Sequence, residues 1–561
     1  MYYLALASDY DGTLAHDGQI SETTTASLKR LRESGRRLVM VSGRIVEELL
    51  TVCPQVELFD CVVAENGALI YWPQTRKSKP LCEPLPRRFV QELRARKVSP
   101  LQVGEVLAAT WEPNEVVVLE TIRDLGLDLH VVFNKGAVMI LPSGFNKSTG
   151  LRAALEEMKL SPHNVVGIGD AENDHPFLDL CECSVAVGNA LPAVKNRSDF
   201  VIEAPNGAAV SELIDHLIKD DLAVQRNPPR RLMSFGAGEG GRTAALPPHG
   251  ARILICGPSG SGKSTLATAL IEILLEREYQ FCLIDPEGDY DEFEGAVVLG
   301  SARHAPEPEE IIKALENPTY NVIVNLLNIR LEERPQFLSR IAPIIQKLRH
   351  DTGRPHWIVL DETHHMLPAG SENPIFSVPD DSVLITTTPD NIDTDILRCI
   401  DIVIATEPAM ITSFCKLVGE TAPEELTIDN TEAVVWFRRG GAQPIRILRP
   451  KSDTSRLRHK RKYAEGELPE DRSFYFRGPQ QKLNLRASNL MTFVQLGDGV
   501  DDETWDFHLH RGDYSRWITE SLKDSSLAAE ISEVEHANGM SARESRAQVR
   551  SAIERRYTAP S

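Results

Sequence analysis

The sequence predicts an α/β fold in two successive domains, followed by a mainly helical tail. Short apolar runs typical of buried strands alternate with stretches of helical composition over the first 450 residues. Several of these runs end in Asp, Gly, Ser or Thr, as strands do where an α/β sheet binds a ligand. Residues 471–561 instead favour helices. The length of 561 residues corresponds to roughly four units of ordinary domain size.

Composition narrows the class of protein. The net charge of -20 argues against a uniformly basic nucleic-acid binder, although it allows a local basic channel. Nine dispersed cysteines without a CxxC pair suggest reduced thiols in a cytosol. No apolar run is long enough to span a membrane, and the N-terminus lacks the basic region of a signal peptide. We therefore expect a cytoplasmic protein without a membrane partner.

The most specific motif lies in the middle of the chain. Residues 252–265 read RILICGPSGSGKST, a G-x-x-x-x-G-K-[ST] loop between a predicted strand and a predicted helix. In such a loop, glycines let backbone N–H groups turn toward phosphate oxygens. Lys263 would place its charge on the β- and γ-phosphates, and Ser264 would offer a hydroxyl to Mg²⁺. The predicted ATP-binding residues are Gly257, Pro258, Ser259, Gly260, Ser261, Gly262, Lys263, Ser264 and Thr265.

A second candidate phosphate site lies near the N-terminus. The apolar run Leu4–Ser8 ends in Asp9-Tyr10-Asp11-Gly12. One interpretation is an ordinary turn, because Asp and Gly are turn residues. The chemical interpretation makes Asp9 a nucleophile that attacks phosphorus, and Asp11 an acid and base that protonates the leaving oxygen and then activates water.

Three later stretches favour the chemical interpretation. Ser42-Gly43-Arg44 follows a buried-type strand, where a hydroxyl and free N–H groups can hold a phosphate oxygen. Lys147 precedes a helical run and could neutralise both nucleophile and phosphate. A further strand, Asn164–Ile168, leads into residues whose oxygen atoms suit Mg²⁺: Asp170, Asn173 and Asp174.

Together, DxDGTL, SGR, the isolated Lys and GDxxND resemble the haloacid dehalogenase-like (HAD) phosphatases over about the first 215 residues. The resemblance implies that Asp9 is the nucleophile and a ligand of Mg²⁺. It implies that Asp11 is the general acid and base, with its backbone carbonyl on the metal. Ser42, Gly43 and Lys147 would hold the phosphoryl group. Asp170 would bind the metal, supported by Asn173 and Asp174.

The segment inside this resemblance predicts a cap. Residues 72–142 read as helix, strand, helix, strand and strand, which resembles the small α/β cap (C2 type) of the Cof and sucrose-phosphate-phosphatase branch. The HAD Rossmann-like core would then comprise residues 1–71 and 143–220. Caps exclude water and select the substrate, which we expect to be a small phosphorylated molecule. Residues 221–250, rich in Pro, Gly and Arg, are predicted to form a linker. Arg230 and Arg231 could contact a phosphate chain, but a flexible tether is the preferred interpretation.

The second domain is predicted over residues 251–450. The apolar run Trp357–Leu360 ends in Asp361-Glu362, a Walker B pattern in which Asp361 would hold Mg²⁺ through water and Glu362 would polarise the attacking water. The strand Val383–Ile385 ends in Thr386-Thr-Thr-Pro389, which suits either a γ-phosphate sensor or a plain turn. The adjacent Glu and the extra strands favour an additional-strand ATPase over a simple kinase.

The stretches LIDPEGDYDEF and LDETHHMLP resemble segments of the HerA/FtsK-like ATPases, hexameric DNA pumps and helicases. The resemblance implies ATP hydrolysis, a homo-oligomer and nucleic acid as a partner. The glutamine–arginine sensor usual in that branch is absent, and Thr386–Pro389 stands in its place. Arg438 and Arg439, near a predicted Gly440-Gly441 hairpin turn, could reach a neighbour's ATP or simply end an exposed strand. His364 and His365 are predicted to pack at a helix start rather than bind metal.

The remaining residues predict a linker and a small helical domain. The basic run 449–463, RPKSDTSRLRHKRKY, could bind nucleic-acid phosphates but is more typical of a solvated linker, which we place at 451–470. In the domain 471–561, the aromatic residues at helical spacing are predicted to form a core rather than a platform for base stacking.

The sequence thus predicts a Mg²⁺-dependent phosphatase fused to an ATPase. One alternative is a nucleic-acid translocase with an end-processing phosphatase, or a polynucleotide kinase–phosphatase. Another is an ATP-switched binding module with little turnover at either site, which the intact motifs disfavour.

Overall fold

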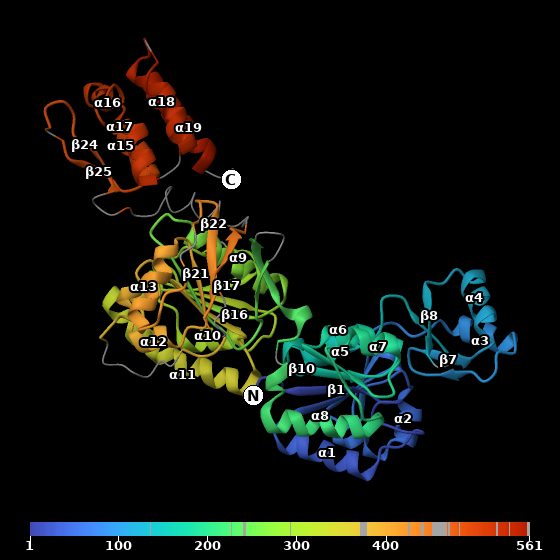
Figure 1. Cartoon of the computed structure of the whole chain (residues 1–561). Helices are drawn as coiled ribbons and strands as arrows, with labels where there is room; N and C mark the ends of the chain where they lie inside the picture. Colours follow the sequence, from blue (N-terminus) through green and yellow to red (C-terminus); the bar gives the residue numbers. More distant parts are fainter. Residues whose placement is uncertain are drawn as a thin grey trace. The chain divides into compact units, whose positions relative to one another are not determined.

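The computed structural model describes residues 1–134, 136–225, 227–238, 243–291, 293–370, 378–424, 427–438, 443–450, 468, 472–481, 483–522, 525–537 and 539–557 (Figure 1). Residues 1–263, 273–286 and 295–449 form one compact unit, which contains two large β-sheets and a smaller one. The chain after Pro450 contributes a small domain of its own. The predicted α/β class is confirmed. None of the helices in the described residues is long and apolar enough to cross a membrane.

The first sheet has the strand order β12-β11-β10-β1-β2-β3-β4-β5. The six strands from β12 to β3 are parallel, and β4 and β5 are antiparallel additions. Helices α1 and α8 cover one face, and α5 and α6 the other, which explains why the central strands are continuous apolar runs (Figure 1). The strands are β1 (Ala5–Asp9), β2 (Arg37–Val41), β3 (Cys61–Ala64), β4 (Leu69–Trp72), β5 (Lys77–Pro80), β10 (Val165–Gly169), β11 (Cys183–Val187) and β12 (Phe200–Ile202). The helices are α1 (Glu22–Glu33), α2 (Val46–Val52), α5 (Lys147–Glu157), α6 (His175–Leu180), α7 (Pro192–Arg197) and α8 (Asn206–Asp220).

The cap is a four-stranded antiparallel sheet in the order β6-β7-β9-β8, with two helices beside it (Figure 1). Its elements are α3 (Arg87–Ala95), β6 (Gln102–Val103), β7 (Ala108–Trp111), α4 (Glu115–Asp124), β8 (Leu129–Asn134) and β9 (Ala137–Pro142). The cap begins later than the predicted residue 72, because β5 pairs with β4 and extends the core sheet. All four residues of β5 are exposed, so backbone pairing rather than an apolar pattern defines this strand.

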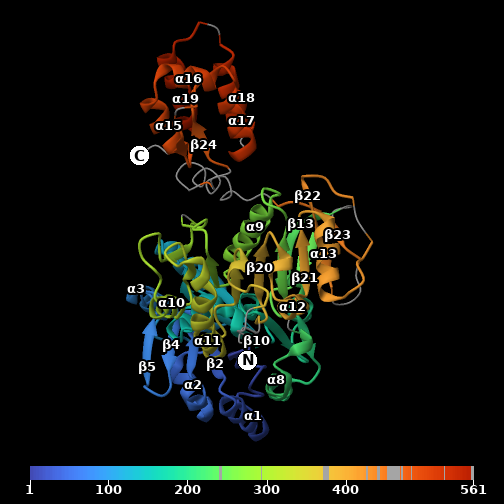
Figure 2. The same ribbon diagram turned by 90° about the vertical axis from the view of Figure 1, so that its left-hand side faces the viewer.

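The second sheet has the order β14-β13-β23-β22-β21-β15-β20-β19-β16-β18-β17. The strands from β21 to β17 are parallel, and β22, β23, β13 and β14 extend the sheet antiparallel on the other side of β21 (Figure 2). Strand β20 lies between β15, which leads into the glycine-rich loop, and β19, which leads into Asp361. This inserted strand is the arrangement expected of an additional-strand ATPase.

The strands of this sheet are β13 (Met233–Gly238), β14 (Thr243–Leu246), β15 (Arg252–Cys256), β16 (Phe281–Asp285), β17 (Ala296–Leu299), β18 (Asn321–Asn325), β19 (Trp357–Leu360), β20 (Ser382–Thr386), β21 (Ile402–Ala405), β22 (Glu432–Phe437) and β23 (Ile445–Leu448). The helices are α9 (Lys263–Glu276), α10 (Pro308–Leu315), α11 (Arg334–Thr352), α12 (Thr394–Arg398) and α13 (Pro408–Val418).

The predicted linker is wrong for much of residues 221–250. Strands β13 and β14 form a hairpin on the edge of the second sheet, with Met233 and Phe235 buried beneath it. Arg230 is not part of a free tether either: its guanidinium donates to Asp199 and to the backbone carbonyls of Cys181 and Glu182. The two alternating runs are short and lie among glycines, so the local composition hides them.

The C-terminal domain is built around aromatic side chains, as predicted. Strands β24 (Phe474–Phe476) and β25 (Leu485–Ala487) form a hairpin against α15 (Leu490–Gly499), α16 (Asp502–Leu509), α17 (Asp513–Trp517), the π-helical turn Ile518–Leu522, α18 (Ser525–Glu535) and α19 (Ala542–Tyr557). Buried rings pack edge to face, for example Phe474 on Phe493 with centroids 5.3 Å apart. The aromatic residues are therefore core. Residues 451–463 of the basic run lie outside the described residues.

Candidate functional site

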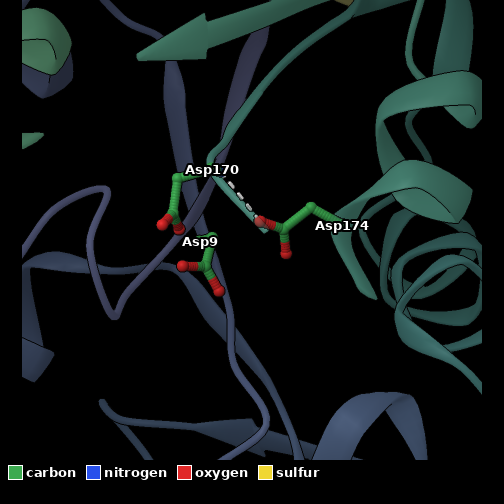
Figure 3. Close-up of side chains that lie close together, drawn as sticks. All are labelled: Asp9, Asp170 and Asp174. Atoms are coloured by element: carbon green, nitrogen blue, oxygen red, sulfur yellow. Dashed lines mark hydrogen bonds between the residues drawn. The ribbon is translucent and has the colours of Figure 1, made fainter. Parts of the chain in front are cut away.

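Three buried carboxylates meet at the carboxyl edge of the first sheet. Strands β1 and β10 are parallel neighbours, so Asp9 at the end of β1 lies beside Asp170, which follows β10. The short turn Glu172–Asp174 brings Asp174 to the same place (Figure 3). One carboxylate oxygen from each of Asp9, Asp170 and Asp174 lies within 4.8 Å of the other two. The structure thus brings together three of the predicted metal ligands.

Lys147 is the cation of this cluster. It is the first residue of α5, and its ammonium donates to Asp9 Oδ1 at 2.6 Å and to Asp174 Oδ1 at 2.5 Å. Asn146 caps the helix by accepting from the backbone N–H groups of Ser148 and Thr149, which fixes the start of α5. Burial alone would lower the pKa of Lys147, but Asp174 and Asp9 together raise it above its ordinary value. The side chain therefore remains charged.

The charge balance of the cluster fits a divalent cation. Three buried carboxylates face one ammonium, and burial and the repulsion of Asp174 raise the pKa of Asp9 despite the opposing effect of Lys147. Asp174 Oδ2 accepts the backbone N–H groups of Asp170 and Ala171, each at 2.9 Å, and Thr13 donates to Asp170 Oδ1 at 3.1 Å. The carboxylates are thus held in place, and an all-oxygen donor set suits Mg²⁺.

Two predicted residues lie outside this cluster. The carboxylate of Asp11 is held by the guanidinium of Arg44 through a two-pronged contact, at 2.7 and 2.8 Å. The Asn173 amide donates to Asn66 Oδ1 at 3.4 Å. The roles assigned to Asp11 as acid and base and to Asn173 as metal support stay predictions.

The predicted phosphate loop lies beneath the cap. Ser42 is buried, and its hydroxyl accepts the backbone N–H of Arg44 at 3.2 Å. A Cβ on Gly43 would lie 3.1 Å from Sδ of Met139 on cap strand β9. Because there is no side chain at Gly43, the cap can approach the loop closely. Cap strand β8 also lies next to the turn that carries Asp174.

Sequence reasoning missed the residue that anchors the cap to the core. Glu65 is completely buried and accepts the backbone N–H groups of Glu105, Val106 and Leu107 at 2.8–2.9 Å. Burial raises the pKa of Glu65, although the three N–H groups oppose this effect. The one feature of the sequence that could have indicated Glu65 is its position as an acidic residue directly after the apolar strand 61–64. The partnership of Arg44 with Asp11 was equally invisible, because the two residues lie 33 positions apart.

The second sheet carries the predicted nucleotide site at its own carboxyl edge. In the loop after β15, Gly260 and Gly262 have φ of +76° and +91°, a left-handed backbone that favours glycine. A Cβ on Gly257 would lie 1.9 Å from Oγ1 of Thr406. The buried Lys263 ammonium lies 3.2 Å from Glu362 Oε1. The structure thus brings the predicted phosphate-binding lysine and the predicted water-polarising glutamate together.

Neighbouring strand ends complete this site. Asp361 follows β19 and accepts the backbone N–H of Glu362 at 2.9 Å. Thr386, the last residue of β20, shares a hydrogen bond of 3.1 Å with His364 Nδ1. Arg449, the first residue of the basic run 449–463, donates to the backbone carbonyls of Ser261, Thr406 and Glu432. The roles of Ser264 and Thr265, in the first turn of α9, stay predictions.

Of the two arginines on the predicted hairpin, the structure describes Arg438. Strands β22 and β23 confirm the hairpin itself, while Arg439, Gly440 and Gly441 lie outside the described residues. Arg438 donates to both carboxylate oxygens of Glu420 and to the carbonyls of Arg398 and Ile400. The geometry therefore gives Arg438 a structural role inside its own domain.

Comparison with known proteins agrees with this division. The family model of haloacid dehalogenase-like hydrolases matches residues 6–98 and 118–214, and that of the helicase HerA central domain matches residues 250–360. Similar proteins include the phosphoglycolate phosphatase of Haloarcula marismortui, 30% identical over 37% of this chain and 95% of the relative, and that of Methanothermobacter thermautotrophicus, 29% identical over 37% and 96%. A similar solved structure is a haloacid dehalogenase-like hydrolase from Bacteroides thetaiotaomicron, with a TM-score of 0.35 and 21% identity over 38% of this chain and 99% of that one.

Through its N-terminal domain the chain belongs to the haloacid dehalogenase-like hydrolases, and this hydrolase is fused to a HerA-like domain.

Proposed function

We propose that the chain is a Mg²⁺-dependent phosphomonoester hydrolase with Asp9 as nucleophile, fused to a domain that hydrolyses ATP. The observation that carries the first half is the buried cluster in which Lys147 bridges Asp9 and Asp174. A lysine charge beside a buried carboxylate at a strand end neutralises an approaching phosphoryl group while keeping the nucleophile aligned.

The proposed reaction has two steps. A carboxylate oxygen of Asp9 attacks phosphorus, the bond to the leaving oxygen breaks, and Asp11 gives its proton to that oxygen. Asp11 then takes a proton from water, which attacks the aspartyl-phosphate, releases inorganic phosphate and regenerates Asp9. Ser42, Gly43 and Lys147 hold the phosphoryl oxygens. Bound Mg²⁺, held by Asp9, Asp170 and Asp174, would supply positive charge for the phosphate.

The substrate proposed first is a small phosphorylated acid. The archaeal relatives are named phosphoglycolate phosphatases, and this chain covers 95–96% of the length of the two described above. The cap closes over Ser42-Gly43, where it limits the size of the molecule that enters.

For the second domain, we propose ATP hydrolysis with Lys263 on the phosphates and Glu362 polarising water, and Mg²⁺ held by Ser264 and Asp361. The match to the HerA central domain supports this assignment and makes DNA the first effector to test. A cytoplasmic homo-oligomer, with a hexamer as the expected ring, completes the proposal.

The test uses the full chain and two matched variants. Phosphate release from 2-phosphoglycolate and from a generic aryl phosphate is measured with Mg²⁺, and ATP hydrolysis is measured with and without DNA. We expect Asp9→Asn to lower phosphatase activity at least 10³-fold and to leave ATP hydrolysis intact, because the nucleophile is lost. Lys263→Ala should lower ATP hydrolysis and leave phosphatase activity intact. Chelation of Mg²⁺ should stop both reactions. Phosphatase activity that survives Asp9→Asn would refute the assignment of the nucleophile.

A further inference from the structure

The HAD core and the HerA-like core contact each other through the amino ends of their strands. On the hydrolase side, His163 and Asn164 precede β10, and Glu182 precedes β11. On the other side, Tyr279 and Gln280 precede β16, and His356 precedes β19. We call His163, Asn164, Glu182, Arg277, Tyr279 and His356 the joint.

A buried carboxylate is the centre of the joint. Glu182 has no exposed surface and accepts hydrogen bonds from His163 Nδ1 at 2.7 Å and from the Tyr279 hydroxyl at 2.9 and 3.1 Å. The other nitrogen of His163 contacts the carbonyl of Arg277 at 2.8 Å, and its ring stacks on Tyr279 with centroids 3.8 Å apart. Glu182 therefore has its ion-pair partner, His163, within the hydrolase and a further hydrogen-bond donor, the Tyr279 hydroxyl, in the other domain. Separating the domains would remove the Tyr279 hydrogen bonds from this carboxylate, which is costly.

A second set of contacts extends the joint. His356 Nδ1 accepts the backbone N–H of Gln280 at 2.8 Å, so its Nε2 carries the proton that faces Asn164 Oδ1 at 3.3 Å. The Asn164 amide in turn donates to the carbonyl of Tyr2 at 2.9 Å, and Tyr2 stacks on His249 at 3.7 Å. These contacts are polar, and the side chains of Asn164 and His356 are buried.

One close backbone approach shows how tightly the surfaces fit. Gly353 ends α11 with φ of +68°, and a Cβ there would lie 2.3 Å from Nδ2 of Asn164. Asn164 cannot easily move away, because it is buried and both ends of its amide are hydrogen-bonded. The only residue that fits at position 353 without displacing the hydrolase is therefore glycine.

From these contacts we propose that the two cores are joined back to back as one body, with their phosphate sites opening on opposite sides and acting on separate molecules. Asp9 lies at the carboxyl end of β1 and Lys263 beyond that of β15, whereas the joint uses amino ends. A five-residue strand spans roughly 16 Å, so two strands end to end separate the sites by roughly 30 Å. The separation of the two reactions rests on the function proposed above, while the joint itself does not. The phosphoryl group of ATP is therefore not passed to Asp9 or to its substrate.

Hydrogen exchange of the full chain, followed by mass spectrometry, tests the joint. Residues 161–165, 181–184, 278–282 and 354–358 should be protected in both cores. Gly353→Ala should lower protection at least tenfold in the hydrolase segments as well as in its own domain. Gly419→Ala is the matched control, because Gly419 ends α13 with φ of +78° and has nothing within 4 Å of a Cβ. Tyr279→Phe, which removes only the hydroxyl, should loosen residues 181–184 in the same way. Fast exchange of these segments in the unaltered chain, or an effect of Gly353→Ala confined to α11, would overturn the joint.

A labelling experiment tests the separation of the reactions. The full chain is incubated with ATP labelled on the γ-phosphorus and with glycolate, and both protein and acceptor are analysed. Label confined to ATP and inorganic phosphate supports two independent sites. Label on the protein or on phosphoglycolate would overturn that part of the proposal. Because hydrogen exchange does not depend on turnover, a chain without phosphatase activity would refute the proposed function and leave the joint standing.

Discussion

At the scale of single residues, Lys147 compensates the negative charge of the buried carboxylates in the hydrolase site. It forms ion pairs with both Asp9 and Asp174, and all three side chains are buried. Without it, two carboxylates would face each other across a low-dielectric site. The lysine therefore stabilises the folded cluster before any substrate arrives, and in the proposed reaction it also holds the oxygens of the phosphoryl group that Asp9 receives.

Replacing this lysine tests that dual role. We expect Lys147→Met to lower kcat/KM for the phosphatase reaction at least 10³-fold and to destabilise the fold by about 3 kcal/mol, because a buried ion pair loses one partner. Added Mg²⁺ should restore part of the lost stability without restoring activity, which a purely structural lysine would not predict. Lys79→Met is the control, since Lys79 forms an exposed pair with Glu157 and should change either quantity little. A Lys147→Met variant that keeps a tenth of the activity would contradict the assignment.

At the scale of elements, a glycine fixes the distance between α5 and the turn Glu65–Gly67. Gly67 has φ of +98°, and a Cβ there would lie 1.8 Å from the Asn146 carbonyl and 2.9 Å from the Lys147 backbone nitrogen. Gly35 has a similar φ of +88° but nothing within 4 Å. Comparing alanine substitutions at Gly67 and Gly35 therefore distinguishes the cost of a left-handed backbone from the cost of a steric clash.

We expect Gly35→Ala to cost about 1 kcal/mol, the usual cost of a left-handed backbone for a residue with a side chain. Gly67→Ala should cost several times as much and should also lower phosphatase activity at least tenfold, because α5 and Lys147 must shift. Chemical denaturation of both variants, together with the phosphatase assay, checks this expectation. Equal losses of stability in the two variants would show that α5 can move at no cost.

The elements that sequence alone could predict are those with local patterns. Asp9, Lys147, Lys263 and Glu362 lie at strand or helix ends marked by apolar runs and glycines, so their placement followed from reading along the chain. Strands β13 and β14 were missed because each has only two inward-facing residues among glycines. Glu65 and the joint were missed because their partners lie far away in sequence: Tyr279 and Glu182 are 97 positions apart. Such contacts arise from tertiary packing and leave no periodic signal.

At the scale of the whole molecule, the joint explains how two unrelated domains can share a chain without sharing a site. Parallel sheets bind ligands at their carboxyl edges, which leaves the amino edges free for packing. The described residues use those amino edges for the contacts between the HAD core and the HerA-like core. The HerA-like domain is therefore suited to carrying or assembling the hydrolase rather than supplying its phosphate.

The joint should also make stability depend on pH. Burial, together with nearby His163, Arg354, Arg349 and His249, holds the pKa of His356 well below its ordinary value of about 6.5. His163, Glu182, Arg277 and Tyr279 are the other titratable groups of the joint, and His163 and Arg231 hold the pKa of Glu182 below its ordinary value despite its burial. The folded state thus favours neutral His356, whose Nδ1 already accepts the N–H of Gln280.

The sign of the effect follows from proton binding. Above about pH 6.5, His356 is neutral in both folded and unfolded chains, and its full contribution to the free energy of unfolding is present. As the pH falls below 6.5, only the unfolded chain takes up the proton, so stability falls by up to about 1.4 kcal/mol per pH unit. Glu182 adds to this loss only below about pH 4.3, its ordinary pKa. Calorimetry of the full chain at pH 7.5, 6.5 and 5.5 should therefore show a falling unfolding temperature. His356→Gln, which retains a donor and an acceptor, should flatten the decline, whereas His350→Gln, at an exposed position beside Asp351, should not. The same decline of the unfolding temperature in wild type and in His356→Gln would show that protonation of His356 does not cause the pH dependence.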